Sequence, residues 1–140
     1  MKILIIEDAK GLREVMTRSL EKERFVVETA ADYSTALQKI NDYDYDCILL
    51  DIMLPGGSGL SILEELKNET RTIILYEAPH RLIRTLEELK ETLGNRRMTL
   101  CRELTKRHET AFHTTIEELI LYYQTEKPLG ECVLVIEGRS

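Results

Sequence analysis

Short apolar runs that alternate with helical stretches limit the folds open to this chain more than any other feature. KILII near the N-terminus is a continuous apolar run, typical of a strand buried on both faces of a parallel sheet. DCILLD and TIILY are further runs of this kind. Between the first two runs, Leu12, Met16 and Leu20 recur at helical spacing and predict an amphipathic helix over residues 9–22. This alternation predicts an α/β fold.

The ends of the predicted helices carry their own signals. Asp32 precedes an apolar stretch with helical spacing, and its side chain is of a type that caps helices well. A later helix rich in leucine is predicted to end at Gly94. Thr115 followed by Glu118 is a capping-box signature for one more helix. RMTLCRE before that helix and ECVLVIE after it predict two further strands.

Strands that alternate with helices imply right-handed crossovers, so we predict a three-layer sandwich with a mostly parallel central sheet. Residues 108–115 alternate weakly and predict a short extra strand, for which an antiparallel edge position is one alternative. With 140 residues, of which 43% are hydrophobic, the chain can bury one core but would be cramped as two domains. We therefore predict a single domain over residues 1–140.

Charge and hydropathy exclude some classes of protein. The net charge of −6 is uneven, because residues 1–68 carry 8 basic and 13 acidic groups and residues 69–140 carry 11 and 12. An acidic first half argues against general nucleic-acid binding there. The apolar runs are all far shorter than the roughly 20 residues that span a bilayer. We therefore expect a soluble, cytoplasmic protein without membrane contact.

The cysteines do not predict a disulfide framework or a zinc site. Cys47, Cys101 and Cys132 are odd in number, widely spaced and each placed in an apolar run. A zinc site would favour paired spacing such as CxxC. We predict reduced thiols in the core.

Acidic residues follow two of the predicted strands directly. Glu7 and Asp8 come after the first strand, and Asp51 comes after the third. Because α/β sheets bind ligands at the carboxyl ends of their strands, the three carboxylates should converge. Such a cluster repels itself unless a cation joins it, and its oxygen ligands suit Mg²⁺. One carboxylate would then be able to attack a phosphoryl donor. The alternative is helix capping, for which Asp8 is well placed.

The first half of the chain resembles a known family. IIED at the first strand and LLDIMLPGGSGL around the third, within residues 1–67, resemble the first half of a bacterial response-regulator receiver domain, which has a flavodoxin-like fold. The resemblance implies that Asp51 is the phosphoacceptor. It also implies that Glu7, Asp8, Asp51 and the backbone carbonyl of Met53 hold Mg²⁺.

The sequence departs from receivers where their switch is built. Receivers end the fourth strand with Thr or Ser and the fifth with Lys, whereas this chain has YEA at 76–78 and CRE at 101–103. Glu77 would bring a fourth negative charge to the phosphoryl position and oppose phosphorylation. Arg102 and Lys106 are the candidates to replace the missing Lys, although Arg differs from Lys in reach and geometry.

The second half resembles a different family. LYEAPHRL, RELTKRHET, TTIEELILYY and PLGECVLVIEG, within residues 72–138, resemble the C-terminal part of tetrapyrrole-methylase-superfamily enzymes, in particular S-adenosylmethionine-dependent methyltransferases of small-subunit ribosomal RNA. The resemblance implies one wall of the methyl-donor cleft. That wall would consist of Tyr76, Glu77, Pro79, His80, Arg81, Arg102, Glu103, Lys106 and His108. The glycine-rich loops of the family's N-terminal domain are absent from this sequence, so we expect neither S-adenosylmethionine binding nor methyltransferase activity.

One stretch is locally basic. Arg96, Arg97, Arg102, Lys106 and Arg107 are either a remnant of an RNA-facing surface or a solvated surface with acidic residues interleaved, and we favour the second.

Both resemblances break off at residues 68–72, with one strand–helix register running through the join. We interpret the chain as an engineered chimera, a single hybrid domain with a receiver-like half (1–68) and a methylase-like half (69–140), which has no selected biochemical activity and is not an enzyme. The alternatives are a working phosphoacceptor receiver of a two-component system and a methyltransferase fragment. We expect no required partner, but an exposed sheet edge would permit a dimer.

Overall fold

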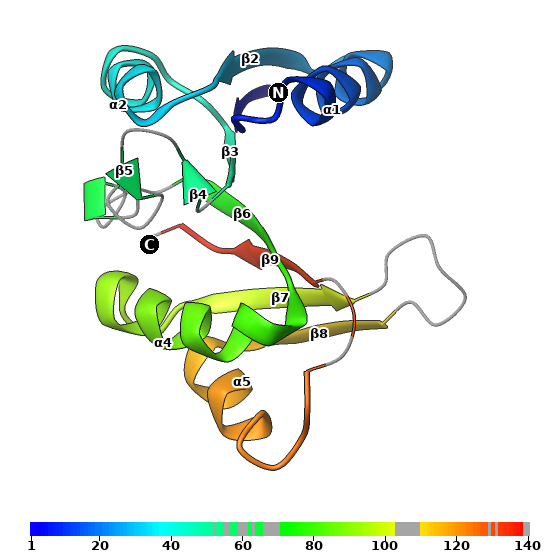
Figure 1. Ribbon diagram of the computed structural model, residues 1–140, viewed down its shortest axis with the longest axis vertical. Helices are drawn as coiled ribbons and strands as arrows, with labels where there is room; N and C mark the ends of the chain where they lie inside the picture. The colour runs from blue at the N-terminus through cyan, green and yellow to red at the C-terminus, as the bar shows by residue number, and fades with distance from the viewer. Residues whose placement is uncertain are drawn as a thin grey trace.

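The computed structural model describes residues 1–51, 53–54, 57–58, 62, 64–65, 71–102, 110–128, 130 and 132–138. Its centre is a seven-stranded sheet with the order β2-β1-β3-β6-β9-β7-β8, which runs from top to bottom in Figure 1. The strands are β1 (Lys2–Ile6), β2 (Val26–Ala30), β3 (Cys47–Leu50), β6 (Thr72–Glu77), β7 (Arg97–Arg102), β8 (Thr110–Thr115) and β9 (Cys132–Ile136), with a separate antiparallel pair β4 (Met53–Leu54) and β5 (Gly57–Ser58). The helices are α1 (Lys10–Lys22), α2 (Tyr33–Asp42), the 3₁₀ turn η1 (Pro79–Arg81), α4 (Leu82–Leu93) and α5 (Ile116–Tyr122).

The sheet changes from parallel to antiparallel pairing after β6. β1 pairs in parallel with β2 and β3, and β3 pairs in parallel with β6. β9 is antiparallel to both β6 and β7, and β8 is antiparallel to β7. The predicted mostly parallel sheet is therefore confirmed for the first four strands and must be corrected for the rest.

The last strand lies inside the sheet, between β6 and β7. It alternates fully and partly buried residues, and its sequence is apolar on both faces, which is why the sequence did not reveal its direction. The outer strands of this sheet are β2 and β8. The weak alternation at residues 108–115 thus corresponds to β8, the antiparallel edge strand that was one of the alternatives.

The described helices are divided unequally between the two faces of the sheet. Buried residues of α2, α4 and α5 join one core cluster with Leu4, Leu50 and Leu134. Met16 and Leu20 of α1 pack on the opposite face. The predicted three layers are therefore present around β1 and β3, whereas the helices that follow β6 both lie on the α2 side. Figure 1 shows α4 and α5 together at the lower end of the sheet.

The predicted helix signals are confirmed. The Asp32 carboxylate accepts a hydrogen bond of 2.8 Å from the amide of Thr35 and caps α2. The hydroxyl of Thr115 accepts one of 3.2 Å from the amide of Glu118 and caps α5. Gly94 ends α4 with a φ of 81°, a conformation that glycine adopts without steric cost.

The cysteines agree with one further expectation. All the cysteines are free thiols, as predicted, and Cys47 and Cys132 are buried. Within the described residues, every helix is too short or too polar to cross a lipid bilayer.

Candidate functional site

The strand register brings the candidate site together at the carboxyl ends of β1, β3 and β6. The parallel ladders align the last core residues of three adjacent strands, which are Ile6, Leu50 and Leu75. One position further along the same strands stand Glu7, Asp51 and Tyr76. Because side chains alternate between the faces of a sheet, this second row points away from the large core and toward the α1 side.

The acidic residues converge as predicted. Carboxylate oxygens of Glu7, Asp8 and Asp51 all lie within 4.8 Å of one another. Glu7 is only 2% exposed, Asp51 is partly buried and Asp8 is exposed. Three negative groups at this distance destabilise one another in the absence of a cation. An oxygen-only donor set with one exposed side suits Mg²⁺, which keeps several of its waters when it binds to protein.

Two neutral groups hold the Glu7 carboxylate in place. The Tyr76 hydroxyl donates a hydrogen bond to Oε1, and the amide of Ala9 donates one of 3.2 Å to Oε2. The capping role proposed for Asp8 is therefore wrong. Ala9 is the residue that precedes α1, without a side-chain cap, and its amide is bound by Glu7 instead.

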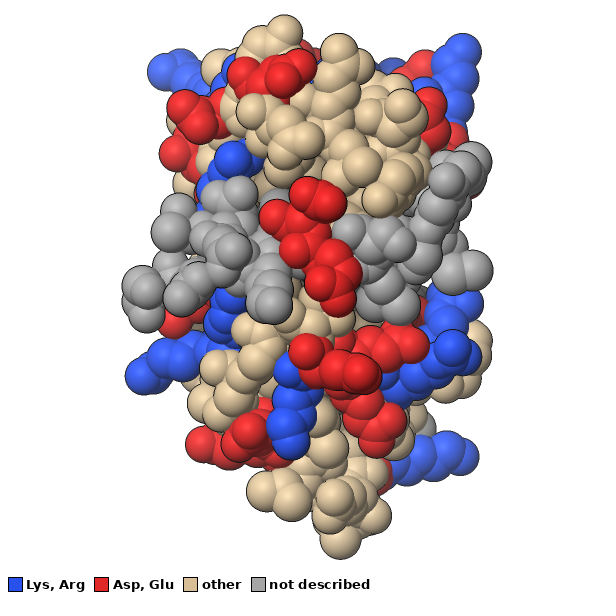
Figure 2. All heavy atoms as spheres, turned by 90° about the vertical axis from the view of Figure 1, so that its left-hand side faces the viewer, with Lys and Arg blue, Asp and Glu red and all other residues tan. Residues whose placement is uncertain are grey.

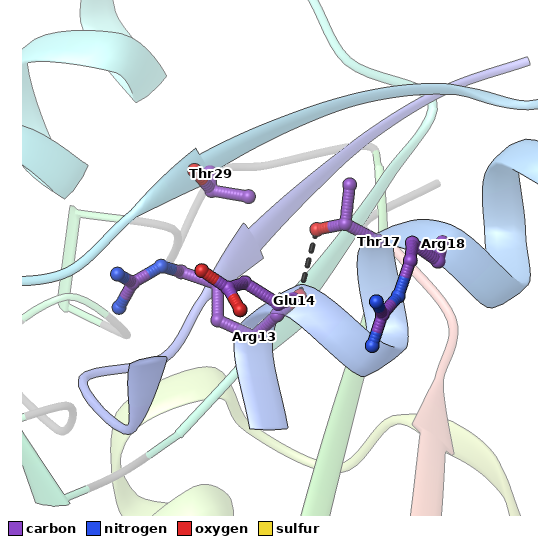
Figure 3. Close-up of a pocket in the computed structure, with 5 residues that line it drawn as sticks. All are labelled: Arg13, Glu14, Thr17, Arg18 and Thr29. Atoms are coloured by element: carbon purple, nitrogen blue, oxygen red, sulfur yellow. Dashed lines mark hydrogen bonds between the residues drawn. The ribbon is translucent and has the colours of Figure 1, made fainter. Parts of the chain in front are cut away.

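Arg13 fixes the loop that carries these carboxylates, a role that the sequence did not reveal. Its Nη1 donates hydrogen bonds to the backbone carbonyls of Glu7 (2.9 Å) and Asp8 (3.3 Å). Figure 3 shows Arg13 beside a groove between α1 and β2, with Thr17 donating a hydrogen bond of 2.7 Å to the Arg13 carbonyl. The only sequence signal for this role is a basic residue in the first turn of the helix that follows an acidic pair.

Tyr76 belongs to the acidic pocket rather than to a methylase cleft wall. It is partly buried, and its pKa is raised chiefly by burial, then by its hydrogen bond to Glu7 and by the negative charges of Asp51, Glu7 and Asp8. The hydroxyl therefore stays protonated at neutral pH and acts as a donor. The sequence grouped Tyr76 with Glu77, but adjacent strand residues face opposite sides of the sheet.

Glu77 does not add a fourth charge to the pocket, and that prediction is corrected. It is 6% exposed on the α4 side of the sheet. Its Oε1 accepts hydrogen bonds of 2.8 Å from the amide of Ala78 and from Nε of Arg81. The Thr85 hydroxyl donates a third bond of 2.8 Å to Oε2. Glu77 is thus satisfied by the first turns of η1 and α4.

Arg102 does not take the place of the missing receiver Lys. It ends β7, with β9 between that strand and β6, and it lies on the face that carries Glu77. Its guanidinium stacks 5.0 Å from the ring centre of Phe112. The other candidate, Lys106, lies outside the described residues.

The remaining predicted residues are not gathered into one cleft. Pro79 and His80 belong to η1 and line a separate groove with Lys127, Pro128 and Gly130. Met53 is the first residue of β4, two positions after Asp51. Glu103 and His108 lie outside the described residues. The predicted cleft wall is therefore divided between the two faces of the sheet.

The basic stretch is partly engaged in internal contacts. Arg96 donates to the carbonyls of Leu93 and Glu137, both at 3.2 Å. On the face drawn in Figure 2, red Asp and Glu side chains run down the middle and also lie near the edges, and blue Lys and Arg side chains lie between and around them. This arrangement does not resemble a continuous phosphate-binding surface.

Comparison with known families agrees with the geometry of the pocket. Residues 3–92 match the family model of the response regulator receiver domain, and the chain belongs to this family. The match continues past the join predicted at 68–72 to the end of α4. Among solved structures, the receiver domain of the Francisella response regulator 1452 is similar, with 27% sequence identity and a TM-score of 0.59 over 88% of this chain and 93% of that chain.

Curated proteins of two kinds are similar to parts of the chain. The phosphate regulon transcriptional regulatory protein PhoB of Escherichia coli is 42% identical over 71 residues, which is 51% of this chain and 31% of PhoB. The ribosomal RNA small subunit methyltransferase I of Synechocystis is 50% identical over 80 residues, which is 56% of this chain and 29% of the enzyme. The chain spans about half or less of the length of the curated relatives that it matches.

Proposed function

We propose that Asp51 is the phosphoacceptor of a Mg²⁺-dependent receiver pocket. The observation that carries this proposal is the convergence of the Glu7, Asp8 and Asp51 carboxylate oxygens within 4.8 Å at the carboxyl ends of β1 and β3. Membership of the receiver family supports the same assignment. Partial exposure of Asp51 leaves it accessible to a small donor, whereas buried Glu7 is better suited to hold a metal.

The residues of the pocket fit the metal that the family implies. Glu7, Asp8 and Asp51, with the Met53 carbonyl, would hold Mg²⁺. Bound Mg²⁺ offsets the negative charge of the carboxylates and of the incoming phosphoryl group. The Asp51 oxygen attacks the phosphorus of an acyl-phosphate donor. The bond from phosphorus to the acyl oxygen breaks, and the acyl group departs as a carboxylate. The product is an aspartyl phosphate, and the amide of Ala9 keeps Glu7 oriented during the transfer.

We also propose that this pocket does not drive a lasting conformational switch. On the side away from β3, the neighbour of β6 is the antiparallel β9. The first residue of β9, rather than its last, therefore lies at the pocket end of the sheet. Arg102 stacks on the opposite face, so no described cation stands in the place of the receiver Lys. The phosphoryl group would then form without the ion pair that receivers use to report it.

The second candidate is an engineered chimera whose pocket has no selected use. Partial similarity to both a receiver protein and a ribosomal RNA methyltransferase favours it. The change to antiparallel pairing after β6 falls close to the join read from the sequence. A natural gene that encodes this same join would contradict the chimera.

We do not expect this chain to act as a methyltransferase. Tyr76 and Glu77, which would share a cleft wall, face opposite sides of the sheet, and a half-cleft gives a small molecule little enclosure. Isothermal titration with S-adenosylmethionine should give no saturable heat, and a saturable binding curve would contradict this expectation.

The phosphoacceptor proposal is tested by intact-mass analysis after incubation with Mg²⁺ and acetyl phosphate. We expect a phosphoryl adduct on the parent protein and none on Asp51→Asn. Glu77→Gln is the matched control, because it removes a buried strand-end carboxylate outside the pocket and should keep the adduct. An adduct that persists in Asp51→Asn, or no adduct on a folded parent protein, would contradict the proposal.

A further inference from the structure

The hydrogen bond between Tyr76 and Glu7 occupies a candidate metal ligand. The two residues are 69 positions apart in sequence and meet because β1, β3 and β6 are adjacent in the sheet. The Tyr76 hydroxyl binds Oε1 of Glu7, while the amide of Ala9 binds Oε2. Both oxygens of the most buried carboxylate in the pocket therefore already have a hydrogen-bond donor.

We propose that Tyr76 sets the affinity of the pocket for divalent cations by competing with the metal for Glu7. This inference rests on the proposed function, in which Glu7, Asp8 and Asp51 hold Mg²⁺. The O–H bond to Oε1 takes one of the lone-pair sites of that oxygen, and the donor also offsets part of the carboxylate charge, so that Oε1 is a weaker ligand for a cation. Metal binding through the Glu7 carboxylate therefore competes with this hydrogen bond, and the cost of weakening or displacing the bond lowers the affinity.

The position of Tyr76 makes the competition hard to avoid. Tyr76 stands in the strand register beside Asp51, and the ring has few rotatable bonds. A flexible surface side chain would move aside at little cost, whereas a half-buried tyrosine on a central strand holds its place.

The chain offers a matched control in Tyr45. Its hydroxyl donates a hydrogen bond of 2.9 Å to Oε1 of Glu28, so it forms the same kind of tyrosine–carboxylate bond outside the acidic pocket. Tyr76→Phe and Tyr45→Phe each remove one oxygen atom and one such bond. A difference between them in metal affinity therefore reports the position of the bond rather than the loss of a tyrosine hydroxyl.

The experiment is isothermal titration of the full chain and both variants with Mg²⁺ at pH 7. We expect Tyr76→Phe to bind about tenfold more tightly, the effect of one hydrogen bond to a charged acceptor. Tyr45→Phe should bind like the parent. Equal or weaker binding by Tyr76→Phe would overturn the inference and leave the proposed function standing. No binding by the folded parent or either variant would overturn the proposed function together with the inference.

A second measurement does not depend on a variant that folds. In the parent protein with ¹³C-labelled tyrosine, Mg²⁺ should shift the ring resonance of Tyr76 as its hydroxyl leaves Glu7, while that of Tyr45 stays in place. A Tyr76 resonance that is unchanged at saturating Mg²⁺ would also overturn the inference.

Discussion

Glu7 and Glu77 stand at the ends of two strands of one sheet and have opposite surroundings. Both are buried, at 2% and 6% exposure, and they face opposite sides of the sheet. Glu77 receives hydrogen bonds from Arg81, Ala78 and Thr85, so one of its donors is a cation. In the described part of the chain, the donors to the side-chain carboxylate of Glu7 are neutral, and Arg13 binds its backbone carbonyl. Carboxylate oxygens of Asp8 and Asp51 lie within 4.8 Å of it.

This difference separates a carboxylate that the protein itself stabilises from one that we propose holds a metal. A buried charge is tolerated when the protein supplies an opposite charge or enough hydrogen bonds. Glu77 obtains both from the start of α4 and needs nothing from solution. Glu7 stands in a cluster of like charges, and a cation from solution would relieve their repulsion. If the pocket binds Mg²⁺ as proposed, the metal should therefore stabilise the folded protein.

The largest effect should come from the core that joins the two regions. Leu50 of β3 and Leu134 of β9 are fully buried in one cluster, so replacing either by Ala should cost about 2–5 kcal/mol of unfolding free energy. If the halves form one domain, each variant shifts the same single urea transition. Leu121→Ala, at a residue 62% exposed, is the control and should change little. Two separate transitions, each moved by one variant only, would divide the protein into independent halves.

A smaller effect should come from the surroundings of Glu77. Thr85→Val removes a donor from this buried carboxylate and should cost about 1–3 kcal/mol, measured by urea unfolding. Thr114→Val is the matched control, because its hydroxyl donates 2.9 Å to Glu118 at the surface, where water can replace the bond. Equal losses in both variants would mean that burial of Glu77 does not set the strength of its bonds.

The smallest effect concerns Asp32, the capping carboxylate of α2, which serves as a comparison for the buried carboxylates of Glu7 and Glu77. The amide of Thr35 donates to it and lowers its pKa. A lowered folded-state pKa contributes stability above the unfolded value of about 4 and loses it as pH falls through the folded value. Asp32→Ala should therefore be less stable than the parent at pH 7, and the gap should narrow at pH 2–3 as parent Asp32 becomes protonated. Asp32→Asn, which keeps a capping oxygen, should lose less, and a gap independent of pH would contradict the charge effect.

The sequence predicted the convergence of the acidic residues better than the positions of Tyr76 and Glu77. Convergence of Glu7 and Asp51 follows from one rule, that the carboxyl ends of adjacent parallel strands lie at the same end of the sheet. The separation of Tyr76 from Glu77 depends on the register of β6 to within one residue, because a shift of one exchanges the two faces. An apolar run such as TIILY is buried on both sides and does not reveal that register.

The order of the last strands could not be predicted from the sequence, for a related reason. β7 and β9 each read as apolar strands, and such strands pack equally well in either direction or order. The position of β9 depends on long-range packing against β6 and β7, which local pattern does not report. That position explains why the pocket lacks a neighbouring parallel strand to carry a receiver Lys.

Thermal unfolding with and without Mg²⁺ in the parent, Asp51→Asn and Glu77→Gln tests the central claim most directly. At ten times its dissociation constant, Mg²⁺ should stabilise the parent by about 1.4 kcal/mol. Asp51→Asn should gain little from Mg²⁺, whereas Glu77→Gln should be less stable without metal and yet gain as much as the parent. The reverse pattern, with stabilisation kept in Asp51→Asn and lost in Glu77→Gln, would contradict the account.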